Sequence, residues 1–142
     1  MTEFQNELLL VAGSQVGIKE ATGHNDGDDV QDYLNSVGLQ GNFSWCQAFV
    51  YWCGQNAALN CGVRNPITRT GLVRSAYDSA DGTKIAFPVV GAQFFMETSD
   101  GHHTGLVTGT WCCGIHTIEG NEANQVLRRM RSHQGIFGYK IY

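Results

Sequence analysis

The spacing of apolar residues changes near residue 84, and this change constrains the fold more than any other feature of the chain. Before it, helical spacing over 4–16 and 29–37, and a nearly continuous apolar stretch over 45–59, predict three helices, with a shorter one over 72–79. After it, segments rich in Val, Ile, Thr and aromatic residues predict strands over 85–90, 92–97, 104–110, 114–119, 125–131 and 136–142. Helices followed by closely connected strands predict an α+β fold whose strands form an antiparallel meander.

Composition and charge narrow the class of protein. The 142 residues fit one domain, 1–142, and we expect a monomer. No apolar run is long enough for a membrane span, and the first residues lack the basic segment of a secretory signal peptide. A formal net charge of −4 disfavours nucleic acid as a partner. We interpret the one basic cluster as a solvated face, with contact to an anionic polymer as the less favoured alternative; it comprises Arg128, Arg129, Arg131 and His133.

The cysteines predict free thiols and no metal centre. Their odd number, without a signal peptide, argues against a disulfide framework; they are Cys46, Cys53, Cys61, Cys112 and Cys113. Zinc is disfavoured because adjacent pairs on strands point to opposite faces and no C-x₂-C spacing exists; the candidate ligands are His102, His103, Cys112, Cys113 and His116. The acidic stretch 25–29 lacks the spacing of an EF-hand calcium loop. We therefore expect neither a metal nor a cofactor.

Cys46 is the first candidate for a catalytic residue. It lies in the sequence SWCQAFVYWC, in which Ser44 and Gln47 have the S-x-x-Q spacing of a capping box. Cys46 is then expected in the first helical turn, where unpaired backbone N–H groups and the helix dipole favour a thiolate. A buried cysteine that serves only as a small apolar side chain is the alternative, and this stretch alone leaves both open.

A histidine and a carboxylate follow in suitable places. In the predicted strand that begins near His102 and His103, only one of the two can face the cysteine helix. The imidazole of a thiol–imidazole pair needs a third group to orient its far nitrogen. The next strand ends in Glu119-Gly120-Asn121, where Glu119 and Asn121 are two residues apart and are expected to face the same way near the ring.

These motifs together resemble the CHAP (cysteine, histidine-dependent amidohydrolase/peptidase) domains, in particular their compact members. The resemblance covers nearly the whole chain, and the order and spacing of the motifs agree with it. It rests on W-C-x-A-F-V-x-W at Trp45–Trp52, H-x-G-[ILV]-V at His103–Val107, E-G-N at Glu119–Asn121, and an upstream G-x-x-E…N stretch at Gly17, Glu20 and Asn25.

The resemblance implies a papain-like fold, with N-terminal helices packed on a C-terminal antiparallel sheet of about five or six strands. It implies cleavage of an amide bond in peptidoglycan, with Cys46 as nucleophile and His103 as general base and then acid. Glu119 would orient His103, and Asn121 would support it by hydrogen bonding. The oxyanion would be met by the backbone N–H of Cys46 and one further donor, for which Asn42 and Gln47 are candidates.

The resemblance also bears on partners and location. The substrate would be the peptidoglycan stem peptide, and the bond could be that of an N-acetylmuramoyl-L-alanine amidase or of an endopeptidase. A chain made in the cytoplasm without a signal peptide would reach the wall as a phage endolysin released through a holin, or as an antibacterial effector with a cognate immunity protein. The alternative is a non-catalytic module that binds cell-wall peptide or serves a structural role.

Overall fold

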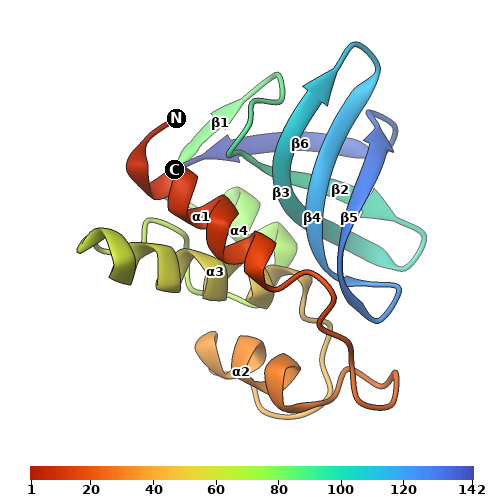
Figure 1. The fold of residues 1–142 in the computed structure, drawn as a ribbon. Coiled ribbons are helices and arrows are strands. Elements are labelled where there is room, and N and C mark those ends of the chain that lie inside the picture. The colour runs from red at the N-terminus through yellow and green to blue at the C-terminus, as the bar shows by residue number, and fades with distance from the viewer.

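The computed structural model describes residues 1–142 as four helices and one six-stranded sheet (Figure 1). The helices come first in the chain and are α1 (Glu3–Ser14), α2 (Asp28–Ser36), α3 (Cys46–Cys61) and α4 (Val73–Asp78). The strands follow and are β1 (Thr83–Ile85), β2 (Gln93–Thr98), β3 (Gly101–Trp111), β4 (Gly114–Glu122), β5 (Gln125–Ser132) and β6 (Ile136–Ile141). Every pair of neighbouring strands is antiparallel. The expected α+β class, with helices N-terminal to an antiparallel sheet, is confirmed.

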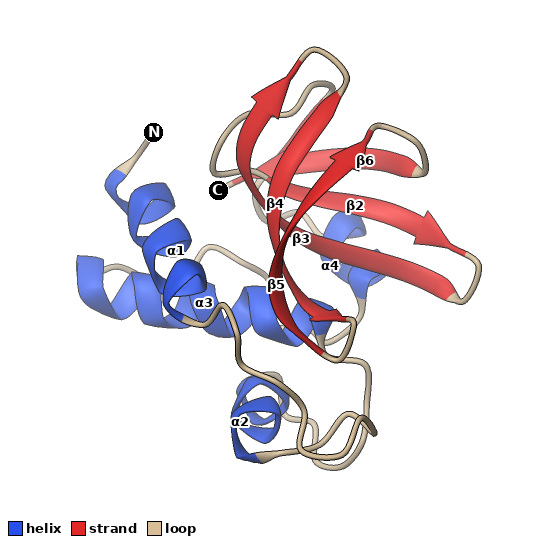
Figure 2. Cartoon of the chain, turned by 45° about the vertical axis from the view of Figure 1, so that its right-hand side comes forward, coloured by secondary structure: helices blue, strands red, loops and turns tan.

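The sheet is strongly curled, and its order departs from the expected meander. Strands β2 to β5 follow one another, but β6 returns to pair with β2, which gives the order β1-β6-β2-β3-β4-β5. Only residues 133–135 connect β5, at one edge, to β6. Because so short a connection cannot cross a flat sheet, the sheet has to bend until β5 approaches β6, and Figures 1 and 2 show this curvature.

The two faces of the curled sheet bury different cores. Helix α3 packs against the outer face, where Leu106, Ile118 and Val126 are fully or almost fully buried, and α1 and α2 pack in turn against α3. A smaller core fills the inside of the curl and comprises Ala92, Phe94, Val107, Ile115 and Tyr139. Neighbouring residues such as Leu106 and Val107 belong to different cores because successive side chains of a strand point to opposite faces. A third cluster, at the start of α3, joins Cys46 to Val73 and Ala76 of α4 and to Phe95 of β2.

The first strand and the helix ends differ from expectation in places. The strand expected over 85–90 is only Thr83–Ile85, because Pro88 lacks a backbone N–H for a sheet ladder, and Phe87 is exposed. The second helix begins at Asp28, with Gly27 as its N-cap residue and no side chain that caps it. A capping box does exist on α1, where the Thr2 hydroxyl accepts from the Gln5 backbone N–H and the Gln5 side chain accepts from the Thr2 N–H.

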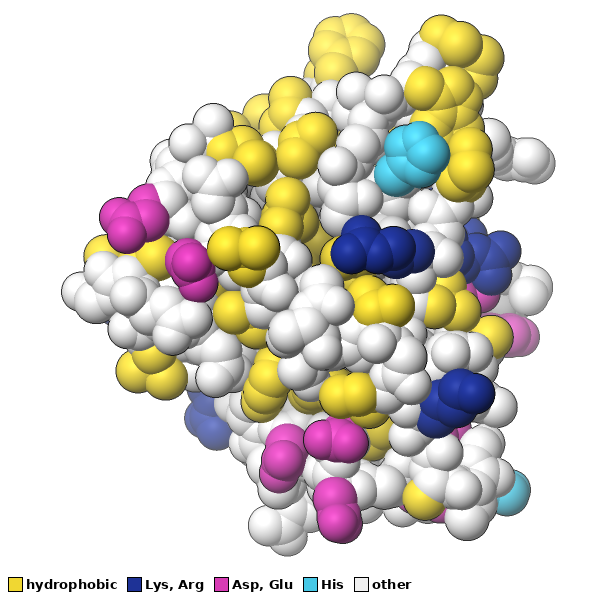
Figure 3. Space-filling view, in the orientation of Figure 1, with side chains coloured by type: hydrophobic (Ala, Val, Ile, Leu, Met, Phe, Trp, Pro, Cys, Tyr) yellow, Lys and Arg dark blue, Asp and Glu magenta, His cyan; other side chains and the backbone are white.

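None of the four helices has the length and apolar character that a membrane-spanning helix needs. Acidic side chains gather over α2 at the lower end of the molecule, and Lys and Arg side chains lie higher, over the sheet (Figure 3).

Candidate active site

The start of α3 holds Cys46, which is the first residue of the helix and is 4% exposed. The preceding residue, Trp45, is fully buried; its indole N–H donates to Glu20 Oε1 at 2.9 Å and its ring stacks on Tyr33. The other oxygen of Glu20 accepts from the Asn25 backbone N–H at 3.0 Å. The buried carboxylate of Glu20 thus ties the loop before α2 to the start of α3, and so fixes where Cys46 lies.

The capping box expected at Ser44 and Gln47 is wrong. The N-cap position is Trp45, and no side chain caps the helix. Gln47 is fully buried, and its Oε1 accepts from Gln93 Nε2 at 2.7 Å, so it belongs to the contact between α3 and the sheet. The backbone N–H groups of the first turn have no acceptors within the helix. They remain the donors that an anion beside Cys46 would meet, whereas the side chain of Gln47 lies in the interior.

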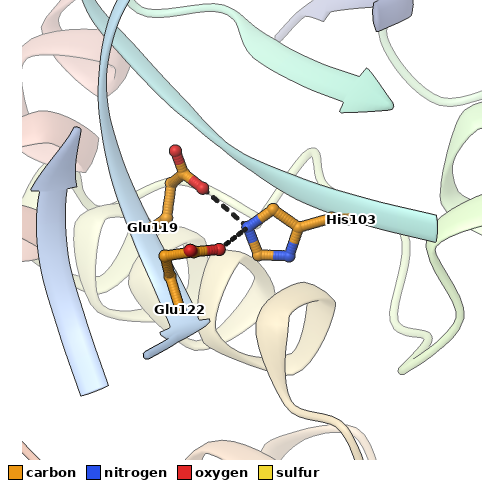
Figure 4. Close-up of side chains that lie close together, drawn as sticks. All are labelled: His103, Glu119 and Glu122. Atoms are coloured by element: carbon orange, nitrogen blue, oxygen red, sulfur yellow. Dashed lines mark hydrogen bonds and ion pairs between the residues drawn. The ribbon is translucent and has the colours of Figure 1, made fainter. Parts of the chain in front are cut away.

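His103 lies near the start of β3 and is 8% exposed. Its Nε2 is 2.6 Å from Glu119 Oε1 and 3.6 Å from Glu122 Oε2, and both carboxylates approach the same nitrogen (Figure 4). Nδ1 is thereby left for Cys46, which lies near enough to the imidazole to help raise its pKa. His102 is exposed, with its ring 5.9 Å from that of Phe137. Of the two adjacent histidines, His103 is the one that approaches Cys46.

Glu119 is fully buried at the centre of this cluster and accepts hydrogen bonds on both oxygens. Besides His103, Arg131 donates to it through Nε at 2.7 Å and through Nη2 at 2.7 Å. The Thr117 hydroxyl donates to Oε2 at 2.6 Å. A carboxylate with this many donors is held ionised and fixed in orientation, which suits a group that orients an imidazole.

The protonation states follow from these contacts. Burial lowers the pKa of His103, but the proximity of Cys46 and the hydrogen bond with Glu119 outweigh it and raise that pKa to about 9. Burial likewise raises the pKa of Glu119, but the hydrogen bonds from His103 and Arg131 outweigh it and lower that pKa to about 2. At neutral pH the pair is therefore an imidazolium and a carboxylate. An imidazolium beside a cysteine favours the thiolate.

Asn121 does not lie where the sequence placed it. With its amide nitrogen toward Glu20, the side chain donates to Glu20 Oε1 at 3.2 Å and accepts from the Trp45 backbone N–H at 3.3 Å. The reason is an irregularity in the pairing of β4 with β5 between Glu119 and Glu122, where Asn121 has a φ of +57°. This bulge breaks the alternation of side chains, so that Glu122 rather than Asn121 joins Glu119 beside His103. Asn121 instead supports the start of α3.

Two glycines of the recognised motifs make room for these contacts. A Cβ atom on Gly105 would lie 2.7 Å from Glu119 Cγ and 2.8 Å from a ring carbon of Phe94. A Cβ atom on Gly120 would lie 2.7 Å from Cβ and Cγ of Phe49, on α3. Each distance is shorter than side chains tolerate, so Gly105 lets the carboxylate reach the imidazole and Gly120 lets β4 pass close to the helix.

Sequence reasoning missed three members of the cluster, namely Arg131, Thr117 and Glu122. Arg131 was grouped with a solvated basic face, yet its guanidinium is mostly buried against two carboxylates. One signal in the sequence indicates the role of Arg131. Arg129 and Arg131 are two residues apart on a predicted strand, so they share one side of the sheet and lie beside the strand that carries Glu119. The position of Glu122 depends on the bulge, which leaves no clear mark in the sequence.

One group of side chains has the composition of a metal site. His103, Glu119 and Glu122 each place a ligand atom within 4.8 Å of the others. However, Nη2 of Arg131 donates to Glu119 at 2.7 Å and to Glu122 at 3.1 Å, so a guanidinium already occupies the place of a cation between the two carboxylates. The residues therefore do not fit a metal ion in this arrangement.

A groove of about 610 Å³ lies beside the start of α3. Ser44 lines it two residues before Cys46, and Leu72 lines it one residue before Val73, which packs against Cys46. Its remaining lining is apolar except for Arg69, Thr70 and Gly71, and includes Val37, Leu39 and Phe43. The groove is therefore next to the segment that leads into α3.

Comparisons with known proteins place the fold. No protein-family model and no curated protein matches the chain. The crystal structure of Ly7917 with the hydrolyzing product of MDP is similar at a TM-score of 0.59 and 18% identity, over 95% of this chain and 61% of that one. A mutated form of the Resuscitation Promoting Factor Interacting protein RipA is similar at a TM-score of 0.58 and 16% identity, over 97% of this chain and 61% of that one. The chain thus spans about three fifths of these longer proteins and shares with them an α+β, papain-like fold.

Proposed function

We propose that the protein is a cysteine hydrolase that cleaves an amide bond of peptidoglycan. The observation that carries the proposal is the arrangement of His103, which lies between the thiol of Cys46 and the buried carboxylate of Glu119. This is the order of groups that activates a thiol for attack on an acyl carbon. The choice of substrate is supported by the resemblance to CHAP domains and by the shared fold with Ly7917, whose structure holds a product of MDP, a peptidoglycan fragment.

The chemistry follows in two halves. The thiolate of Cys46 attacks the carbonyl carbon, and the oxyanion that forms is met by backbone N–H groups at the start of α3. The imidazolium of His103 gives its proton to the leaving amine, the C–N bond breaks, and a thioester with Cys46 remains. Neutral His103 then takes a proton from water, the hydroxide attacks the thioester, and the C–S bond breaks to release the carboxylic acid and restore the thiolate of Cys46 beside the imidazolium. Glu119 keeps the ring oriented and stabilises its charged form throughout.

The groove beside Cys46 is the place that we propose for the stem peptide. Its apolar walls suit the short side chains of such a peptide, and no carboxylate of the protein pairs with Arg69 on its rim. Its Nε donates to the Ser36 carbonyl oxygen at 2.9 Å, which leaves the other N–H groups of the guanidinium to meet a carboxylate of the substrate. Such a substrate places the site of action at the cell wall. Release with a holin, or delivery as an effector with an immunity protein, remain proposals about how the protein gets there.

The experiment that tests the proposal is digestion of purified sacculi with mass spectrometry of the products. We expect the wild-type protein to release fragments and Cys46→Ala to release none, because the substitution removes the nucleophile and with it the acyl-enzyme route. Cys61→Ala is the matched control on the same helix and should retain activity. A free lactyl group on the glycan would identify an amidase, and a new amine within the stem or cross-bridge would identify an endopeptidase.

Two outcomes would contradict the proposal. Fragment release by Cys46→Ala near the wild-type rate would show that the thiol is not the nucleophile. Sedimentation of the protein with sacculi, without any product from wild type, would favour the alternative of a module that only binds the wall.

A further inference from the structure

We propose that Arg131 is a positioning residue of the active site, whose guanidinium sets the protonation of His103 by holding Glu119 in place and by offsetting the charge of Glu122. This inference rests on the proposed function only for its effect on hydrolysis. The effect on the protonation of the imidazole follows from contacts among side chains of the protein, and it can be measured without a substrate.

The contacts of Arg131 are those of a clamp. Nε and Nη2 reach the two oxygens of Glu119, each at 2.7 Å, and Nη2 also reaches Glu122 at 3.1 Å. A planar guanidinium that binds both oxygens fixes the plane of the carboxylate as well as its position. Since Oε1 of Glu119 also meets His103 Nε2 at 2.6 Å, the clamp determines how that oxygen points at the ring.

The charges around His103 explain why a clamp is needed. Two carboxylates approach the ring from β4, Glu119 at 2.6 Å and Glu122 at 3.6 Å, while Cys46 approaches from α3. Each of these groups stabilises the imidazolium when it carries a negative charge. Arg131 is the cation in contact with both carboxylates, and the more exposed Arg129 binds only Glu122, at 2.6 Å. Without Arg131, the ring would face two carboxylates with one of them uncompensated.

The position of Arg131 in the fold separates this role from that of an ordinary surface arginine. Arg131 lies on the inner face of the curled sheet with its guanidinium over Phe94, and its side chain is 16% exposed. Arg128, on the same strand, is exposed on the other face and forms no ion pair. Arg128 therefore provides a control of the same residue type on the same strand.

The test measures the titration of His103 by NMR of protein labelled with ¹³C-histidine, with the signal assigned by its loss in His103→Gln. We expect Arg131→Gln to raise the pKa of His103 by about one pH unit or more, because a cation is removed from two carboxylates that contact the ring. Arg131→Lys keeps the charge but cannot bind both oxygens of Glu119. Its titration should stay near the wild-type value, while hydrolysis falls on the order of 10- to 100-fold because the ring is less well held. Arg128→Gln should change neither measurement.

A wild-type titration in folded Arg131→Gln would overturn the inference, and so would an equal shift in Arg131→Lys and Arg131→Gln. If Arg131→Gln fails to fold, Arg131→Lys decides: unchanged titration with slower hydrolysis supports positioning, and an unchanged rate overturns it. If the wild-type protein releases no fragment from sacculi, the titrations still decide the inference, and only the proposed function fails.

Discussion

At the scale of single residues, the protonation of His103 results from opposed effects. Burial alone would favour a neutral imidazole, but contacts with Cys46 and Glu119 raise its pKa to about 9. A proton is thus held on the ring at neutral pH, from which the leaving amine would take it in the reaction that we propose. The carboxylate of Glu119 can perform this role because it is itself held by Arg131 and Thr117, and so does not take up the proton.

The adjacent histidines provide the sharpest test at this scale. We expect His103→Ala to reduce the release of fragments from sacculi as severely as Cys46→Ala, because residues that act as one unit have non-additive effects. His102→Ala is the matched control and should retain most of the activity, since His102 is exposed and contacts Phe137 instead. If His102→Ala loses more activity than His103→Ala, the catalytic histidine is His102, on the other face of β3.

At the scale of elements, close approach between strands and helix builds the site. Helix α3 brings Cys46, β3 brings His103, and β4 brings Glu119, and two glycines permit the contact. The N-terminus of α3 is fixed by tertiary contacts in place of a cap: Glu20 and Asn121 together bind the indole and the backbone of Trp45. In the histidine motif, Gly105 leaves the space that Glu119 occupies beside β3.

Gly105→Ala tests this reading of the motif. An added methyl group would lie 2.7 Å from Glu119 Cγ and 2.7 Å from the Ile118 carbonyl oxygen, so the carboxylate or the strand has to move. We expect loss of stability by about 1–3 kcal/mol, as for other overpacked sites, and a larger loss of hydrolysis than stability alone explains. Urea unfolding and fragment release from sacculi measure the two effects.

Gly109→Ala, on the same strand, is the control for Gly105→Ala. Its added methyl group would meet only the side chain of His116, at 3.2 Å, and that ring can shift. If the two variants lose equal activity, the loss in Gly105→Ala comes from a general effect of alanine on β3 and not from a clash with Glu119.

The sequence predicted these elements well and the contacts between them less well. The helices and most strands follow from local periodicity, and strand alternation correctly limited the choice between His102 and His103. The bulge after Glu119 and the return of β6 beside β2 depend on the curl of the whole sheet, which no local pattern encodes. For the same reason the sequence pattern predicts Asn121 beside His103 and Arg131 on a solvated face, whereas the structure has Asn121 beside Trp45 and Arg131 against Glu119. Tertiary context decided these cases.

At the scale of the whole molecule, the site lies where the parts of the fold meet. The core between helices and sheet ends at Trp45, the small core inside the curl ends near Phe94, and the cluster around Cys46 joins α3 to α4 and β2. Buried charges at such a junction link the protonation of His103 to folding, because the same contacts hold the imidazole and join the side chains of β3, β4 and β5.

The stability of the whole molecule should therefore depend on pH through this pair. The pKa of Glu119 is lowered from 4.5 to about 2, so its contribution is present above pH 4.5 and is lost as the pH falls toward 2. The pKa of His103 is raised from 6.5 to about 9, so its contribution is present below pH 6.5 and is lost as the pH rises toward 9. The contribution of Glu119 and His103 to the free energy of unfolding should therefore be highest between about pH 4.5 and 6.5. It should fall on either side by on the order of 3 kcal/mol.

Urea unfolding between pH 2 and 10 measures this dependence, and Glu119→Gln isolates its source. An amide cannot be protonated in this range and stabilises the imidazolium less, so the variant should be less stable on the plateau and flatter on both sides. Glu97→Gln, at an exposed position on β2, is the matched control and should keep the wild-type curve. If Glu119→Gln instead shows the wild-type slopes, then the pH dependence arises elsewhere, and the contact between Glu119 and His103 does not contribute to folding.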